Sequence, residues 1–199
     1  MTIAYYLSHP QVQVDATVPV PDWGLSDAGR NRLSTLVGGW LAAIRFIVSS
    51  EENKAIETAR LLAPHTQAGS VEILPGFHEN DRSATGFLPP PEFEATADAF
   101  FATPDVSVRG WERAIDAQSR IVDAVRDVLA SHAPTDPILF VGHGGVGTLL
   151  KCWLKGEAIS RSADQAAEGG HPGGGNVHAF SIPALRHLFG WTALERVTA

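Results

Sequence analysis

Short apolar runs of strand length alternate along this chain with longer segments that carry apolar residues at helical spacing. The apolar runs, most of them closed by Gly, Pro or Ser, are residues 3–7, 44–48, 71–74, 137–141, 177–182 and 188–197. The helical segments between them are residues 27–41, 51–63, 92–101, 109–132 and 146–154. Strands that alternate with helices favour a mainly parallel sheet covered on both faces. The pattern therefore predicts an α/β fold with three layers, an α/β/α sandwich around a mainly parallel central sheet.

The length of the chain bounds its domain organisation. A chain of 199 residues, 44% of them hydrophobic and 19% charged, has the composition of an ordinary globular protein and fits one compact domain. We therefore predict a single domain over residues 1–199. Residues 77–91 are polar and contain Gly and Pro, which suits a loop over a site better than a core element. We predict a loop and helical insertion at about residues 77–110 that covers the site.

The charge of the chain disfavours some classes of partner. Its 15 Lys and Arg against 22 Asp and Glu give a formal net charge of −7, whereas nucleic acids and anionic membranes attract clustered Lys and Arg. No run approaches the ~20 apolar residues that span a bilayer. The first residues also lack the basic start and apolar core of a signal peptide. We therefore expect a cytoplasmic protein that binds neither nucleic acid nor membrane, and the oligomeric state stays open.

A histidine follows two of the predicted strands almost directly. His9 comes after residues 3–7, and His143 comes after residues 137–141. In open α/β sheets, ligands bind just beyond the carboxyl ends of the strands, where residues far apart in sequence converge. The positions of His9 and His143 therefore predict that both belong to one active site.

Five short motifs, taken in order, give the chain a resemblance to a known family. They are Leu7-Ser8-His9-Pro10 at the end of the first strand, Leu25-Ser26-Asp27-Ala28-Gly29-Arg30, Ser49-Ser50 with Lys54-Ala55 and Thr58-Ala59, Glu79, and Val141-Gly142-His143-Gly144-Gly145. Together they resemble the histidine phosphatase superfamily, and the resemblance spans most of the chain. It implies the phosphoglycerate mutase-like fold and phosphoryl-transfer chemistry.

The resemblance implies three catalytic residues. His9 takes the position of the histidine that accepts the phosphoryl group, and neutral imidazole suits this task because it is abundant near pH 7 and nucleophilic. His143 takes the position of the second family histidine, which stabilises the transferring group. Glu79 matches the proton donor, which protonates the leaving group and can later activate water if burial raises its pKa. Its neighbour His78 is a rival, but Glu79 has the family position.

Departures from the family pattern lie around the phosphate. Ser8 stands where the family has an arginine, Pro10 where it has a glycine, and Lys54 where a second phosphate-binding arginine is usual. Arginine offers phosphate a bidentate fork, whereas serine offers one hydroxyl and lysine a point charge, so the pocket is less cationic. Arg82 follows Glu79 on the same predicted loop, and our hypothesis is that it reaches the phosphate. Ser8, Lys54 and Arg82 are thus the predicted phosphate-binding residues.

These residues favour one function and leave two alternatives. The first is a metal-independent phosphatase that hydrolyses a small phosphate monoester through a phosphohistidine on His9, without a cofactor. A noncatalytic member that binds a phosphorylated ligand or partner is the main alternative, which Ser8 and Pro10 support. A mutase is the second alternative, and it must retain the phosphoryl group.

His171 and His178 flank a Gly-rich segment, but they lack a Cys partner and a close acidic ligand set, so we predict no metal site.

Overall fold

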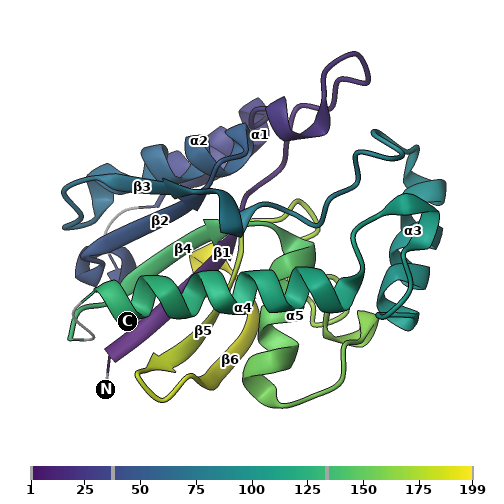
Figure 1. Cartoon of the computed structure of the whole chain (residues 1–199). Helices are drawn as coiled ribbons and strands as arrows, with labels where there is room; N and C mark the ends of the chain where they lie inside the picture. Colours follow the sequence, from purple (N-terminus) through teal and green to yellow (C-terminus); the bar gives the residue numbers. More distant parts are fainter. Residues whose placement is uncertain (1, 37–38, 133–134, 199) are drawn as a thin grey trace.

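A six-stranded mixed sheet forms the centre of the protein, as the computed structural model of residues 2–36, 39–132 and 135–198 shows (Figure 1). The strands are β1 (Thr2–Ser8), β2 (Phe46–Ser50), β3 (Val71–Leu74), β4 (Ile138–Gly142), β5 (Asn176–Ile182) and β6 (Arg186–Ala193). Their order is β3-β2-β4-β1-β5-β6. The first four run parallel, whereas β5 and β6 are each antiparallel to the preceding strand in this order. The predicted α/β fold with a mainly parallel sheet is confirmed.

Helices cover both faces of this sheet. In the described residues they are α1 (Asp27–Ser34), α2 (Asn53–Leu62), α3 (Pro90–Ala102), α4 (Ala114–Ser131) and α5 (Gly144–Lys155). The pair α1 and α2 packs on one face, and the pair α4 and α5 packs on the other (Figure 1). None of the helices described is both long enough and apolar enough to cross a membrane.

Side-chain alternation along the central strands builds two cores, one on each face. In β1, Ala4 and Tyr6 belong to the core under α4 and α5, while Tyr5 and Leu7 belong to the core under α1 and α2. Successive side chains of a strand point to opposite faces, so a strand buried on both sides is apolar at nearly every position. All five residues of β4 are buried for the same reason. The two central strands therefore appear in the sequence as continuous apolar runs.

The first helix is shorter than predicted. The sequence predicts a helix over residues 27–41, but α1 ends at Ser34, and Gly39–Ala43 form a short 3₁₀ turn. Part of the predicted helix, residues 37–38, lies outside the described residues. The pair Gly38-Gly39 disfavours a continuous helix, because glycine in a helix interior costs ~1 kcal/mol relative to alanine.

Two strands are shifted relative to their predicted bounds. The strand predicted over residues 44–48 is Phe46–Ser50, because its pairing with β4 begins at Phe46. The last strand, predicted over residues 188–197, is Arg186–Ala193, where the chain pairs with β5. The shift of β2 matters for the site, because it places Ser50 at the end of a strand and Glu52 directly before α2.

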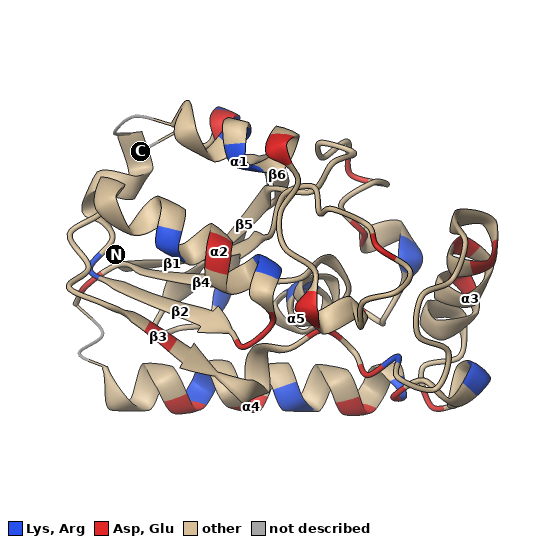
Figure 2. Cartoon of the chain, turned by 90° about the horizontal axis from the view of Figure 1, so that it is seen from above, with Lys and Arg blue, Asp and Glu red and all other residues tan. Residues whose placement is uncertain are grey.

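The carboxyl ends of the parallel strands point toward the same side of the molecule, and α3 lies beyond them on that side (Figure 1). Viewed from above, the Lys and Arg positions, coloured blue along the ribbon, are spread over several elements (Figure 2). The predicted site residues are therefore expected at the carboxyl ends of the parallel strands, on the side of the sheet where α3 lies.

Candidate active site

His9 and His143 lie next to each other at the ends of neighbouring strands. Strands β1 and β4 pair in parallel with Ser8 opposite Gly142, and the backbone N–H of His9 donates to the carbonyl of Gly142 at 2.9 Å. The residues that follow this pair are the two histidines. Their ring centroids are 5.2 Å apart, with the rings nearly perpendicular at 71°. The register of two strands thus brings together residues that are far apart in sequence.

The ring of His9 is held in one tautomer. Its Nδ1 lies 2.8 Å from the carbonyl oxygen of Pro10, and because a carbonyl only accepts, Nδ1 must carry the proton. Burial, together with the nearby His143 and Lys54, lowers the pKa of His9 to about 3. The ring is therefore neutral near pH 7, and Nε2 has a free lone pair. An unprotonated imidazole nitrogen of this kind can act as a nucleophile.

His143 is fully buried and fixed from two sides. Its backbone N–H donates to the hydroxyl of Tyr6 at 3.1 Å, and its Nε2 lies 2.9 Å from the Ser50 hydroxyl and 3.4 Å from Glu52. Burial lowers the pKa of its ring, although Glu52 and Glu79 act in the opposite direction. In the described part of the chain, Nδ1 of His143 has no hydrogen-bond partner. This atom is buried directly behind His9, which lines two of the cavities at the site.

Glu79 binds the start of helix α5. Its carboxylate accepts hydrogen bonds from the backbone N–H groups of Gly145 at 3.1 Å and Val146 at 2.9 Å. Burial, the largest single influence, acts to raise the pKa of Glu79, but Arg82, His143 and the hydrogen bond from Val146 together outweigh it. The pKa of Glu79 is therefore lowered, whereas its predicted role as proton donor calls for a raised pKa. The helix N-terminus and the nearby cations favour the ionised carboxylate, so Glu79 is charged at neutral pH.

Ser8 makes its contacts inside the protein. Its hydroxyl donates to Gln165 Oε1 at 2.9 Å and accepts from the backbone N–H of Asn176 at 3.1 Å. The Asn176 side chain donates to the same Gln165 oxygen at 2.8 Å. The Ser8 side chain is almost wholly buried. It therefore ties the end of β1 to β5 and to the loop that carries Gln165.

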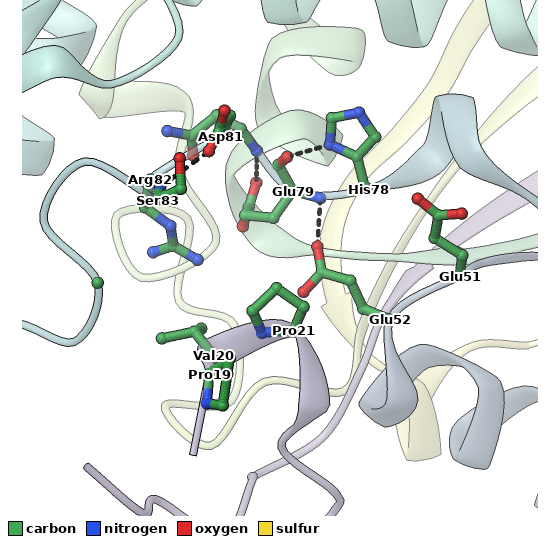
Figure 3. A pocket seen from close by; sticks show the side chains of 12 residues that line it. Pro19, Val20, Pro21, Glu51, Glu52, His78, Glu79, Asp81, Arg82 and Ser83 are labelled. Carbon is green, nitrogen blue, oxygen red and sulfur yellow. Dashed lines mark hydrogen bonds between the residues drawn. The ribbon is translucent and has the colours of Figure 1, made fainter. Parts of the chain in front are cut away.

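Lys54 is buried in an ion pair with Glu52 at the start of α2. Its Nζ also donates to the carbonyl of Val20 at 2.7 Å. Glu52 accepts in addition from the backbone N–H of Glu79 at 2.8 Å (Figure 3). Burial tends to raise the pKa of Glu52, but His143 and Lys54 hold it well below its usual range. One carboxylate thus contacts three of the predicted site residues.

Arg82 stands on the loop after Glu79. Its guanidinium lies over the rings of Phe93, 5.2 Å from the centroid, and Trp111, 5.6 Å from the centroid. Within the described residues it rests on aromatic rings rather than in an ion pair. Figure 3 shows the Arg82 guanidinium and the Glu52 carboxylate directed into the same cavity from opposite walls. Arg82 is the cation of the site whose charge is least neutralised by a direct partner.

Comparison with known proteins identifies the family. The sequence model of the histidine phosphatase superfamily (branch 1) matches residues 9–167, a range that contains His9, Lys54, Glu79 and His143. The chain belongs to the histidine phosphatase superfamily. A search of curated proteins finds no match.

Several solved structures have the same fold. The mycobacterial glucosyl-3-phosphoglycerate phosphatase is 19% identical, with a TM-score of 0.72 over 97% of this chain and 99% of that one. Bacillus stearothermophilus YhfR is 20% identical, with a TM-score of 0.71 over 94% and 95% of the two chains. Phosphoserine phosphatase from Entamoeba histolytica is 14% identical, with a TM-score of 0.72 over 98% of both. At these identities, the likeness shows a shared fold.

Three cavities of this histidine phosphatase superfamily member meet at Arg82, which lines all of them. The first, of about 470 Å³, lies between Glu52, Glu79 and His78. The second, of about 330 Å³, is lined by His9 and Glu79. The third, of about 260 Å³, is lined by His9 and Lys54. His9 and Glu79 share a cavity, whereas His78 lines only the first of the three, which favours Glu79 over its neighbour.

Sequence reasoning missed two residues of the site, Glu52 and Gln165. Glu52 lies inside the helix predicted over residues 51–63, but α2 begins at Asn53 and the Glu52 carboxylate turns inward to Lys54. An acidic residue between a strand end and Lys54 is the signal that could have found it. Gln165 gives no such signal, because its contact with Ser8 spans 157 positions.

The residues described contain no cluster of three or more His, Cys, Asp or Glu side chains that could hold a metal ion. His178, one of two histidines weighed for metal binding, is fully buried and stacks on Tyr6 with ring centroids 5.2 Å apart. It also packs edge-on against Trp191 at 4.7 Å. His178 therefore belongs to the core behind Tyr6, and His171 lines the cavity of about 330 Å³.

Proposed function

We propose that this chain is a metal-independent phosphatase that hydrolyses a phosphate monoester through a phosphohistidine on His9. The observation that carries the proposal is the state of His9. Its Nδ1 proton is bound to the Pro10 carbonyl, its ring is neutral, and it lines cavities open to a ligand. A histidine in this state is ready to attack phosphorus with Nε2.

The reaction proceeds in two steps. In the first, the Nε2 lone pair forms a bond to phosphorus while the ester P–O bond breaks, and its electron pair leaves with the alcohol oxygen. The Glu79 carboxyl, in its protonated form, supplies the proton when that oxygen needs one. In the second, water attacks the phosphohistidine, Glu79 accepts a proton from the water, and the P–N bond breaks. Inorganic phosphate then leaves and His9 is restored.

Charge on the transferring group is stabilised by the surrounding donors. Phosphoryl transfer depends mostly on positioning and on stabilising the equatorial oxygens. Arg82 supplies a guanidinium from the loop above the site. A bound phosphate dianion favours protonation of His143, whose Nδ1 then donates as well. Lys54 contributes its charge through the space it shares with His9.

The noncatalytic alternative rests on a specific observation, the pairing of Lys54 with Glu52. A phosphate-binding cation that is already neutralised weakens the attraction for a phosphate dianion. The same weakness disfavours a mutase, which must hold the phosphoryl group between two substrates. A phosphatase benefits from weaker phosphate binding, because inorganic phosphate must leave the site in every catalytic cycle.

A substrate screen tests the proposal. Wild type, His9→Ala and a control variant, His65→Ala, are incubated with a panel of phosphorylated metabolites and a generic aryl phosphate, and released phosphate is measured. His65 follows the carboxyl end of α2, at the end of that helix opposite to Lys54. We expect turnover by wild type and His65→Ala, loss of turnover in His9→Ala, and acid-labile phosphate on His9. Unchanged activity in His9→Ala would overturn the mechanism, and ligand binding without turnover would favour the noncatalytic member.

A further inference from the structure

We infer that the preferred substrate of this site is the phosphate monoester of an aromatic alcohol, whose ring binds in the cavity of about 260 Å³ beside His9. The inference rests on the proposed phosphatase activity and adds the chemical class of the leaving group. Two independent features carry it: the apolar lining of this cavity, and the protonation state of Glu79.

The cavity has two kinds of lining. One part of it is lined by His9, Lys54 and Arg82, the residues predicted to accept or bind the phosphoryl group. Most of its remaining lining is apolar and comes from two segments far apart in sequence. These apolar residues are Val12, Val20, Trp23, Phe87, Leu88 and Phe93. A ligand that fills this space therefore has an anionic end and an apolar body.

Trp23 and Phe87 join the two segments and give the cavity an aromatic wall. Their ring centroids lie 5.7 Å apart at 58°. The indole N–H of Trp23 donates to the carbonyls of Asp15 at 2.8 Å and Val18 at 3.0 Å, so its polar atom is used within its own loop. Phe87 remains 37% exposed and has ring surface left to cover. Aromatic rings prefer tilted and edge-to-face partners of this kind, so an aryl group fits the wall.

The size of the cavity suits an aryl group. An apolar protein cavity of about 150 Å³ accommodates benzene. At about 260 Å³, this cavity has room for one ring or a fused pair beside the phosphate. The cavity is bounded by two loops and by the first turns of α2 and α3 rather than by the strands of the sheet, and loops of this kind commonly determine which ligand a fold binds.

The ionised state of Glu79 at neutral pH is consistent with a phenolate as the leaving group. Its lowered pKa leaves it ionised at neutral pH, where it is a poor proton donor. Phenolic O–H groups have a pKa of about 10, whereas water, with an O–H group like that of an aliphatic alcohol, has a pKa of about 15.7. A phenolate can therefore leave with little help from an acid, and an alkoxide cannot.

The neighbouring cavity of about 330 Å³ is the rival location. It also opens onto His9; Glu94 lines both cavities, and Arg161 and Asp164 line this one alone of the two. Arg161 lies near both carboxylates, with ion-pair distances of 2.5 and 3.5 Å, so its charge is largely neutralised within the protein. A polar, uncharged leaving group such as a polyol would fit there, and it is the competing outcome of the test.

Three substrates separate ring binding from leaving-group acidity. Phenyl phosphate has an aromatic ring and an acidic alcohol, benzyl phosphate has the ring with an aliphatic alcohol, and ethyl phosphate has neither. We expect KM to be about tenfold lower for phenyl and benzyl phosphate than for ethyl phosphate. We expect kcat at pH 7 to be highest for phenyl phosphate, because it alone needs little protonation. Equal KM values for all three would overturn the inference.

A variant of the aromatic wall provides the second arm. Phe87→Ala removes the exposed ring, and Leu61→Ala is the matched control, since Leu61 is 39% exposed on α2. The measured quantity is the ratio of kcat/KM for benzyl over ethyl phosphate. We expect Phe87→Ala to lower this ratio about tenfold and Leu61→Ala to leave it unchanged. An unchanged ratio in Phe87→Ala, or a preference for glycerol phosphate, would assign the leaving group to the polar cavity.

Failure of the inference is distinguishable from failure of the proposed function. If the chain is not a phosphatase, none of the three esters releases phosphate and His9 is not phosphorylated by any of them. If only the inference fails, phosphate is released from ethyl or glycerol phosphate at least as well as from phenyl phosphate, and the release still depends on His9.

Discussion

Glu52 and Lys54 form a buried ion pair at the start of α2, with side chains only 7% and 3% exposed. The pair lies within the site rather than beside it. Glu52 contacts the backbone N–H of Glu79 and lies 3.4 Å from His143 Nε2. Two carboxylates, Glu52 and Glu79, thus oppose two cations, Lys54 and Arg82, so the site carries little excess positive charge. This balance sets how tightly it can hold a phosphate dianion.

Glu52→Gln is expected to tighten the binding of inorganic phosphate. The amide keeps the shape of the side chain and an oxygen for the Glu79 N–H, but it removes the negative charge beside Lys54. A charge-assisted hydrogen bond contributes about 1.5–3 kcal/mol, so we expect the inhibition constant for phosphate or vanadate to fall about tenfold. The inhibition constant is measured at pH 7 from competition with a phosphate ester that the enzyme hydrolyses.

Glu51→Gln is the matched control for that experiment. Glu51 is the adjacent residue, it is exposed, and its substitution removes the same formal charge. We expect a change of less than about twofold, because exposed charges are screened by solvent and salt. If Glu51→Gln tightens phosphate as much as Glu52→Gln, the effect is one of net charge and the buried pair has no special part in it.

Activity toward an alkyl phosphate is expected to rise as the pH falls from 7 to 5. The pKa of Glu79 is lowered, so at neutral pH only a small fraction carries the proton that an alkoxide leaving group needs. That fraction grows tenfold for each pH unit of acidification until the pKa is reached. His9 stays neutral over this range because its pKa is about 3. The measurement is the pH profile of kcat for ethyl phosphate.

Glu79→Gln separates this effect from protonation of the substrate. Phosphate esters take up a proton near pH 6, and that change occurs with either enzyme. We expect the variant to have lower activity and a flatter profile between pH 7 and 5, since its amide cannot donate an acidic proton. A profile of the same slope in wild type and variant would remove Glu79 from the role of proton donor.

Ser8→Ala is expected to reduce stability rather than phosphate binding. The Ser8 hydroxyl accepts from the buried N–H of Asn176 and donates to Gln165, and a buried group left without its partner costs about 1–3 kcal/mol. Urea unfolding of Ser8→Ala is compared with that of Ser34→Ala, whose hydroxyl is exposed at the end of α1. An unchanged unfolding free energy with a raised KM would show instead that Ser8 contacts the substrate.

Local patterns in the sequence predicted the fold and the placement of His9 and His143 at the ends of two strands. Each central strand is a continuous apolar run because it is buried on both faces, and a histidine directly after such a run lies at the carboxyl end of the sheet. The pairing of β1 with β4 in register then places His9 beside His143. The strands and the histidines that follow them depend on residues a few positions apart, whereas the convergence of His9 and His143 follows from the general rule that ligands bind at the carboxyl ends of parallel strands.

Features that depend on distant contacts could not be predicted in the same way. The pKa of Glu79 was expected to be raised by burial, but its carboxylate meets N–H groups of α5, 66 and 67 positions away. The contact of Ser8 with Gln165 spans 157 positions. Glu52 turns inward because α2 begins at Asn53 rather than at residue 51. Composition and spacing give no information about such partners.

Gly145→Ala is expected to lower kcat/KM for an alkyl phosphate at least about tenfold by displacing the Glu79 carboxylate. A Cβ at residue 145 would lie 2.6 Å from Glu79 Oε1, too close for both to stay in place. Helix α5 itself should tolerate the change, because alanine is favoured over glycine in helices by up to ~1 kcal/mol. Gly69→Ala is the control, since nothing lies within 4 Å of a Cβ there. Full activity in Gly145→Ala, with unfolding measured in parallel, would mean that the carboxylate position seen here is not required for proton transfer.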